Sequence, residues 1–172
     1  LGRDRLVSWG RHFGFGSKIG LEGLSEAAGN LPFGMDSRLL AIGQGELTVT
    51  PLQAARMMAL VANGGRMTEV HLIQSPRSPD RPLAQVDLRL RSDVLGVVKR
   101  ALRDVVNDPA GTGYRSARSD QIVIAGKTGS PELGGEHPTH SWFVGYAPAD
   151  RPQIAFAVVV EQAGHGSATA AP

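Results

Sequence analysis

The chain has 172 residues, 41% of them hydrophobic and 20% charged, with a formal net charge of +2 and a pI near 9.4. This balance is typical of a globular domain with one hydrophobic core and does not indicate disorder. No run of basic residues is interleaved with aromatics, which excludes nucleic acid as a partner, and the absence of cysteine excludes disulfides and thiolate metal sites.

Neither a signal peptide nor a run of 18 apolar residues occurs, so the sequence predicts no segment that crosses a membrane. The first predicted element is a short amphipathic helix between Asp4 and Phe15, because Leu6, Trp9 and Phe13 recur at helical spacing. The Gly-rich stretch from Lys18 to Phe33 predicts a surface loop or an extended arm.

A second helix is predicted from Pro51 to Ala62, after a short extended piece at Leu47–Thr50. Thr50 is the expected N-cap, Pro51 suits the first helical position, and Gln53 completes a capping box. Its expected packing face consists of small and apolar residues: Leu52, Ala55, Met58, Ala59, Val61 and Ala62. Three prolines between Ser75 and Pro82 predict an exposed loop.

The third predicted helix begins at Ser92 or Asp93 and ends before the helix-breaking Asn107-Asp-Pro109. Its expected packing face is formed by Val94, Val98, Leu102 and Val105. The stretch from Ala110 to Asp120 has no periodicity and predicts a loop that leads into a strand.

Three strands are predicted at the C-terminal side. Ile122 to Ser130 begins with β-branched residues and predicts an inner strand, whereas Ser141–Ala147 and Ile154–Val160 flank a Pro-rich turn and predict a hairpin. Together they predict an antiparallel three-stranded unit covered by helices, which is an α/β fold of the α+β type.

The strand from Ile122 ends in Lys127-Thr-Gly129, which combines three chemical functions. Lys127 supplies positive potential, Thr128 supplies a hydroxyl, and Gly129 lets a ligand's backbone lie close to the strand. These properties suit an anionic, peptide-like ligand. Lys-Thr-Gly is also a signature of penicillin-binding proteins and class A β-lactamases.

Four further stretches, in the same order, resemble the transpeptidase domains of penicillin-binding proteins, above all the monofunctional (class B-like) kind. They are Phe13-Gly-Phe-Gly16 with Gly29-Asn-Leu-Pro32, Ala41-Ile-Gly-Gln-Gly-Glu-Leu-Thr-Val-Thr-Pro-Leu-Gln53, Gly111-Thr-Gly-Tyr114, and His140-Ser-Trp-Phe-Val-Gly-Tyr-Ala-Pro148. The resemblance covers nearly the whole chain and implies a β-lactamase/transpeptidase-like fold.

The resemblance also implies an acyl-serine mechanism, in which a serine attacks a D-Ala-D-Ala stem peptide and an amine resolves the acyl-enzyme. The family uses S-x-x-K and S-x-N for this chemistry, but no serine here has Lys three residues later or Asn two residues later. We therefore expect residues 1–172 to be the C-terminal portion of one transpeptidase domain, incomplete at both ends, without catalytic residues of its own.

By the same resemblance, Lys127, Thr128 and Gly129 would bind the substrate's terminal carboxylate. The backbone N–H of Ser130 would contribute to the oxyanion hole. His140 and Trp142 are expected at the wall of the site in structural roles. A metal site at His137 and His140 is not expected, because no third ligand has suitable spacing.

No cofactor is expected. The implied partners are peptidoglycan stem peptides, β-lactams, the N-terminal remainder of the domain and a membrane glycosyltransferase, at the extracytoplasmic face of the bacterial membrane. Two alternatives remain open: a serine β-lactamase with the same fold, and a non-catalytic penicillin-binding-like interaction module. In-frame S-x-x-K and S-x-N motifs upstream of Leu1 would favour the enzyme over the interaction module.

Overall fold

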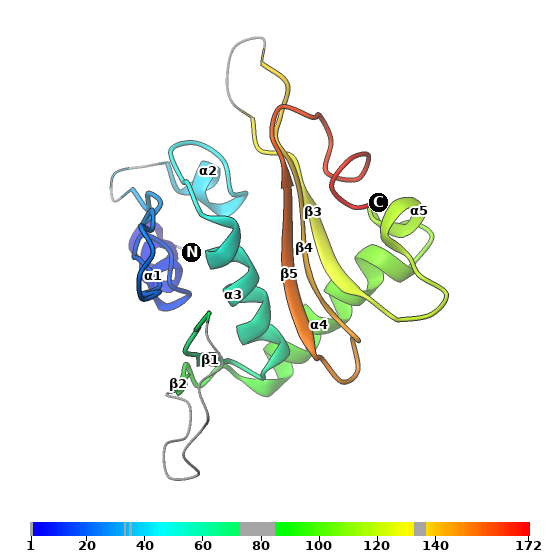
Figure 1. Ribbon diagram of the computed structural model, residues 1–172, viewed down its shortest axis with the longest axis horizontal. Coiled ribbons are helices and arrows are strands. Elements are labelled where there is room, and N and C mark those ends of the chain that lie inside the picture. The colour runs from blue at the N-terminus through cyan, green and yellow to red at the C-terminus, as the bar shows by residue number, and fades with distance from the viewer. Residues whose placement is uncertain (1, 33, 35, 73–84, 133–136) are drawn as a thin grey trace.

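The computed structural model describes residues 2–32, 34, 36–72, 85–132 and 137–172. The predicted exposed loop at Ser75–Pro82 lies outside the described residues. In chain order the elements are α1 (Arg3–His12), α2 (Ser37–Ala41), α3 (Pro51–Ala62), β1 (Arg66–Thr68), β2 (Gln85–Asp87), α4 (Ser92–Asn107), α5 (Tyr114–Ala117), β3 (Ala125–Gly129), β4 (Ser141–Ala147) and β5 (Ile154–Val160). Figure 1 shows α3 on one side of the larger sheet, α5 and the C-terminus on the other, and α1 and α2 beyond α3.

The larger sheet confirms the predicted antiparallel three-stranded unit. Its strand order is β3-β4-β5, and both neighbouring pairs are antiparallel. The Pro-rich turn connects β4 to β5 as a hairpin, as predicted. The paired strands β1 and β2 and the short helices α2 and α5 were not predicted. α5 interrupts the stretch that was predicted as a loop.

The prediction for β3 was wrong in two respects. The strand begins at Ala125 and lies at the edge of the described three-stranded sheet instead of inside it. The β-branched residues before Ala125 use their backbone carbonyls elsewhere, since Val123 O accepts from Ala149 N at 2.7 Å and Ile124 O accepts from Asn107 Nδ2 at 2.8 Å. Hydrogen bonds to the hairpin and to α4 therefore replace strand pairing here.

Helix α3 has the predicted bounds and the predicted start. Thr50 Oγ1 accepts from Gln53 N at 3.1 Å, while Gln53 Oε1 accepts from Thr50 N at 2.8 Å, which completes the capping box. The predicted packing face was partly wrong, because Leu52 is exposed whereas Gln53, Ala54 and Leu60 are buried. Met58 is buried, as predicted.

The packing face of α4 was predicted correctly in part: Leu102 and Val105 pack against the cores, as predicted, but Val94 and Val98 do not. Leu95 and Val106 are its buried residues, whereas Val94 is 52% exposed and Val98 is 39% exposed. The reason is that α4 passes between two cores. Its Leu102 packs with the core around Met58, Ala125 and Tyr146, while Val106 belongs to the core around Phe143.

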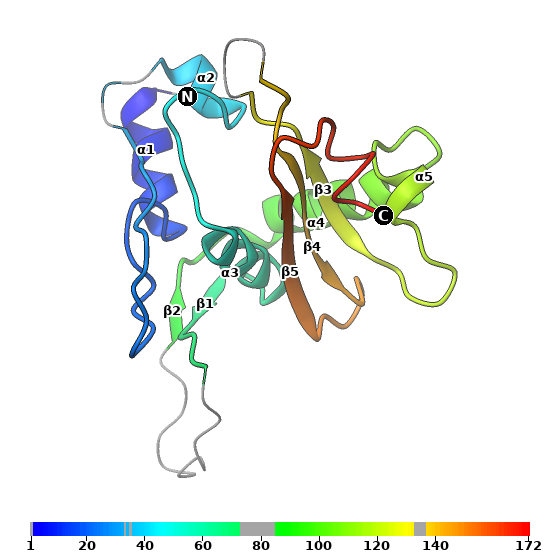
Figure 2. The ribbon, with the colours of Figure 1, turned by 45° about the horizontal axis from the view of Figure 1, so that its top comes forward.

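The arm that follows α1 is pinned by one buried side chain. Gln53 is 1% exposed, and its Nε2 donates to Ser17 O and to Ala28 O, both at 2.8 Å. Both ends of the arm thus meet at the start of α3, and residues 18–27 extend away from it (Figure 2). In α1 itself Val7 is the buried residue, whereas Trp9, which was predicted to pack, is 40% exposed.

Candidate functional site

A cleft of about 1020 Å³ opens between the start of α3 and the larger sheet. One side is formed by residues 42–45 and 47–49 and the first turns of α3, and the other by the end of β3 and the segment after it. The floor is apolar and comes from β4 and β5. The residues from β3 onward that line the cleft are Lys127, Thr128, Gly129, Ser130, Pro131, Glu132, His140, Trp142, Val144, Val159, Glu161, His165 and Ser167.

All six predicted site residues lie at this cleft, although they do not point the same way. Lys127 pairs with Val144 and Gly129 with Trp142 across β3 and β4, so these four share the face of the sheet toward α3. The ammonium of Lys127 hydrogen-bonds the backbone carbonyl of Thr128. A cation thus lies at the end of β3 above an apolar floor.

Thr128 points to the opposite face of β3, because successive strand residues alternate. It is 7% exposed, and its Oγ1 lies 2.7 Å from Oγ1 of Thr112, in the loop before α5. Thr112 also lines the cleft. The two hydroxyls therefore hold each other in place at the edge of the sheet.

The glycines of β3 differ in how much space surrounds them. A methyl group on Gly126 would lie 2.8 Å from the Phe143 ring and 2.8 Å from Val144 O, which is too close for a real side chain. The same group on Gly129 would meet only Trp142 Cβ, at 3.4 Å. Gly126 is therefore required by packing, whereas the absence of a side chain at Gly129 leaves the cleft surface open.

His140 and Trp142 line the cleft. His140 Nδ1 accepts from Gln162 N at 3.1 Å, so the ring makes a hydrogen bond to the backbone after β5. Trp142 Nε1 is buried and has no hydrogen-bond partner within the described part of the chain. Burial raises the pKa of Tyr146, which lies in the core with Met58 and Ala125.

Several residues of the cleft were not predicted as site residues. Phe15, Glu161, His165 and Ser167 line it, and His165 had been interpreted as a plain loop residue. Gln44 lies on the α2–α3 side and accepts from Glu132 N at 3.1 Å, which joins the two sides of the cleft. The Ile42-Gly-Gln-Gly45 stretch was a signal for Gln44, but no local pattern marks His165 or Glu161.

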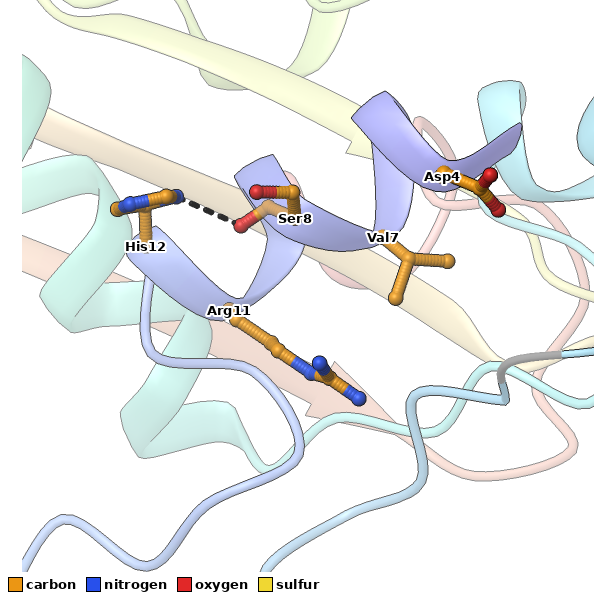
Figure 3. Close-up of a pocket in the computed structure, with 5 residues that line it drawn as sticks. All are labelled: Asp4, Val7, Ser8, Arg11 and His12. Atoms are coloured by element: carbon orange, nitrogen blue, oxygen red, sulfur yellow. Dashed lines mark hydrogen bonds between the residues drawn. The ribbon is translucent and has the colours of Figure 1, made fainter. Parts of the chain in front are cut away.

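A smaller hollow of about 350 Å³ lies along α1 and shares no residue with the cleft. Its five lining residues all come from that helix: Asp4, Val7, Ser8, Arg11 and His12. Figure 3 shows His12 hydrogen-bonded through Nδ1 to Ser8 O, at 2.7 Å. Within the described part of the chain, no second element contributes a lining residue to this hollow.

Among the described residues, no cluster of three or more His, Cys, Asp or Glu side chains is placed to hold a metal ion. In the same part of the chain, no helix is long and apolar enough to span a membrane.

A family model described as the penicillin binding protein transpeptidase domain matches residues 1–172. The chain therefore belongs to the penicillin-binding protein transpeptidase family, as the sequence motifs had indicated. Its curated relatives include the peptidoglycan D,D-transpeptidase MrdA of Haemophilus influenzae, which is 31% identical over an alignment that covers 100% of this chain and 32% of the relative. The chain thus spans about a third of that relative's length.

Solved structures confirm the fold class of mixed helices and antiparallel sheet. PBP2 of Pseudomonas aeruginosa, solved in complex with WCK 5153, matches with a TM-score of 0.81 and 36% identity, covering 100% of this chain and 41% of that one. PBP2 of Helicobacter pylori, solved in complex with MreC, matches with a TM-score of 0.80 and 28% identity, covering 97% of this chain and 33% of that one.

Proposed function

We propose that this chain is the substrate-facing, C-terminal portion of a peptidoglycan D,D-transpeptidase domain that works through an acyl-serine and is acylated by β-lactams. The observation that carries the proposal is the end of β3, where Lys127 and the side-chain-free Gly129 face a large cleft above an apolar floor. An extended peptide that ends in a carboxylate fits a strand that offers a cation, a hydroxyl and an unobstructed backbone.

The proposed roles follow from chemistry. Lys127 attracts the terminal carboxylate of the stem peptide. The Thr128 hydroxyl, which lines the cleft at the edge of the sheet, accepts from Thr112 and donates a hydrogen bond to the carboxylate. The backbone N–H of Ser130 stabilises the oxyanion that develops as the carbonyl is attacked. The nucleophilic serine and its lysine come from sequence outside this chain, since no S-x-x-K occurs within it.

The expected location is the extracytoplasmic face of the bacterial membrane, where the curated relatives' substrate lies. The partners we propose are the N-terminal remainder of the domain and a membrane glycosyltransferase that supplies the glycan strands. A solved complex between a relative, PBP2 of Helicobacter pylori, and MreC supports assembly with a further protein.

A fluorescent penicillin tests the proposal. The 172-residue chain and the protein extended with its upstream sequence are each incubated with the label and separated on a denaturing gel. We expect label only on the extended protein, weakened by Lys127→Ala and unchanged by Lys18→Ala, which removes an exposed lysine from the arm. Label on the 172-residue chain itself would place the nucleophile within it and overturn the proposal.

A further inference from the structure

After β5 the chain turns back across the ends of β4 and β3 and finishes beside α5 (Figures 1 and 2). We call residues 162–171 the C-terminal clasp. It contributes His165 and Ser167 to the lining of the cleft, so it is part of the site.

The clasp is fixed at its beginning by hydrogen bonds to the segment before β4. Gly164 N donates to Thr139 O at 3.0 Å, and Thr139 Oγ1 donates back to Gly164 O at 2.8 Å. Gln162 N donates to His140 Nδ1. These three bonds set where the chain leaves the sheet.

The far end of the clasp is fixed by burial. Ala170 and Ala171 are 5% and 6% exposed and belong to the core that contains Phe143. Ser141, at the start of β4, is fully buried; its Oγ donates to His165 O at 3.1 Å and accepts from Ala170 N at 2.9 Å. One hydroxyl thus ties both halves of the clasp to the sheet.

Between these two attachments the clasp packs directly against the end of β3. Gly166 N donates to Ser130 Oγ at 3.0 Å. A methyl group on Gly166 would lie 2.3 Å from Gly129 O and 2.5 Å from Trp142 O, so the two backbones are in direct contact. The hydroxyl of Ser130 therefore accepts a hydrogen bond from the clasp, and its backbone continues the substrate-facing strand.

We propose that the clasp positions the end of β3 for acylation, with Ser130 Oγ as its attachment to the strand end and Ser141, which does not line the cleft, as a positioning residue. The inference rests on the proposed function, because the group being positioned is the Ser130 backbone N–H at the oxyanion. Donors to a developing charge act only at the right distance, so a small shift of the strand end lowers the acylation rate constant more than it weakens substrate binding.

The test uses the full protein, with the sequence that precedes Leu1. Time courses with a chromogenic β-lactam separate the noncovalent dissociation constant from the first-order acylation rate constant. We expect Ser130→Ala to lower the rate constant roughly tenfold at an unchanged dissociation constant, and Ser130→Thr, which keeps the hydroxyl, to restore it. Ser141→Ala loosens the clasp without touching β3 and should act in the same direction, whereas Ser25→Ala in the exposed arm is the matched control.

The outcomes separate the two proposals. If the unmodified protein is not acylated, the proposed function fails, and the clasp proposal fails with it. If the unmodified protein is acylated and Ser130→Ala and Ser141→Ala react at its rate, only the clasp proposal is overturned. A loss confined to the melting temperature, with both kinetic constants unchanged, would assign the clasp a purely structural role and overturn it as well.

Discussion

Two glycines three positions apart on β3 have opposite tolerances for a side chain. Gly126 is enclosed by the ring of Phe143 and the carbonyl of Val144, so any Cβ there needs a backbone shift. Gly129 has ordinary van der Waals space, because a Cβ there would meet Trp142 Cβ at 3.4 Å. At the scale of single residues, fold and function therefore depend on different glycines of one short strand.

Replacing each glycine by alanine should separate these effects. Gly126→Ala should lower the free energy of unfolding by roughly 1–3 kcal/mol, since it overpacks the core. Gly129→Ala should change stability by less than about 0.5 kcal/mol, yet slow acylation on the order of 100-fold, because the methyl group displaces the ligand backbone. Urea unfolding and β-lactam acylation of the extended protein measure the two quantities. Equal stability of both variants would contradict the packing argument.

At the scale of elements, α4 shows what a helical period can and cannot predict. The bounds of the helix were predictable, because Ser92, Asp93 and the Asn107-Asp-Pro109 breaker are local signals. The packing face was predictable only in part, at Leu102 and Val105, since α4 contacts two cores and its apolar residues are more numerous than those cores bury. Val94 and Val98 have the periodicity of core residues and are nevertheless exposed.

Alanine substitutions on α4 should report this difference between buried and exposed apolar residues. Val106 is 0% exposed, so Val106→Ala should cost about 2 kcal/mol in lost burial and cavity formation. Val94→Ala should cost less than about 0.5 kcal/mol, because the side chain is half exposed and alanine favours a helix. Urea unfolding of the two variants measures the difference. A larger loss of unfolding free energy for the Val94 variant than for the Val106 variant would instead support the packing face predicted from the sequence.

For the strands and the site as well, features set by neighbouring residues were predictable from the sequence, whereas features set by distant residues were not. Pairing of β4 with β5 was predictable, because a short turn joins them. The true start of β3 was not, because it depends on where Asn107 and Ala149 donate their hydrogen bonds. Lys127 was found from its motif, whereas His165 reaches the cleft only because the clasp crosses the sheet.

At the scale of the whole molecule, one part of the larger sheet carries exposed apolar residues. Ile154 is 61% exposed and Val158 is 41% exposed, both on the face of β5 that also carries Phe156. β5 is also an edge strand of the described sheet. Exposed apolar edge strands promote association between chains.

We therefore expect the 172-residue chain to self-associate when it is expressed alone. The double substitution Ile154→Lys and Val158→Lys should shift it toward the monomer, because charge on an edge strand opposes pairing. Light scattering coupled to size exclusion measures the mass. Leu24→Lys, at an exposed apolar residue of the arm, is the matched control. A monomer that melts in one sharp cooperative transition would contradict this expectation.

The way Gln53 closes the base of the arm has a consequence for how this chain can change in evolution. Because one amide holds Ser17 and Ala28 side by side, the residues between them form a loop whose two ends lie close together. Doubling the length of such a loop costs only about 0.6 kcal/mol in chain entropy. The arm is thus a point where sequence can be inserted, or a new binding segment acquired, while Phe15 and the start of α3 keep their places at the cleft.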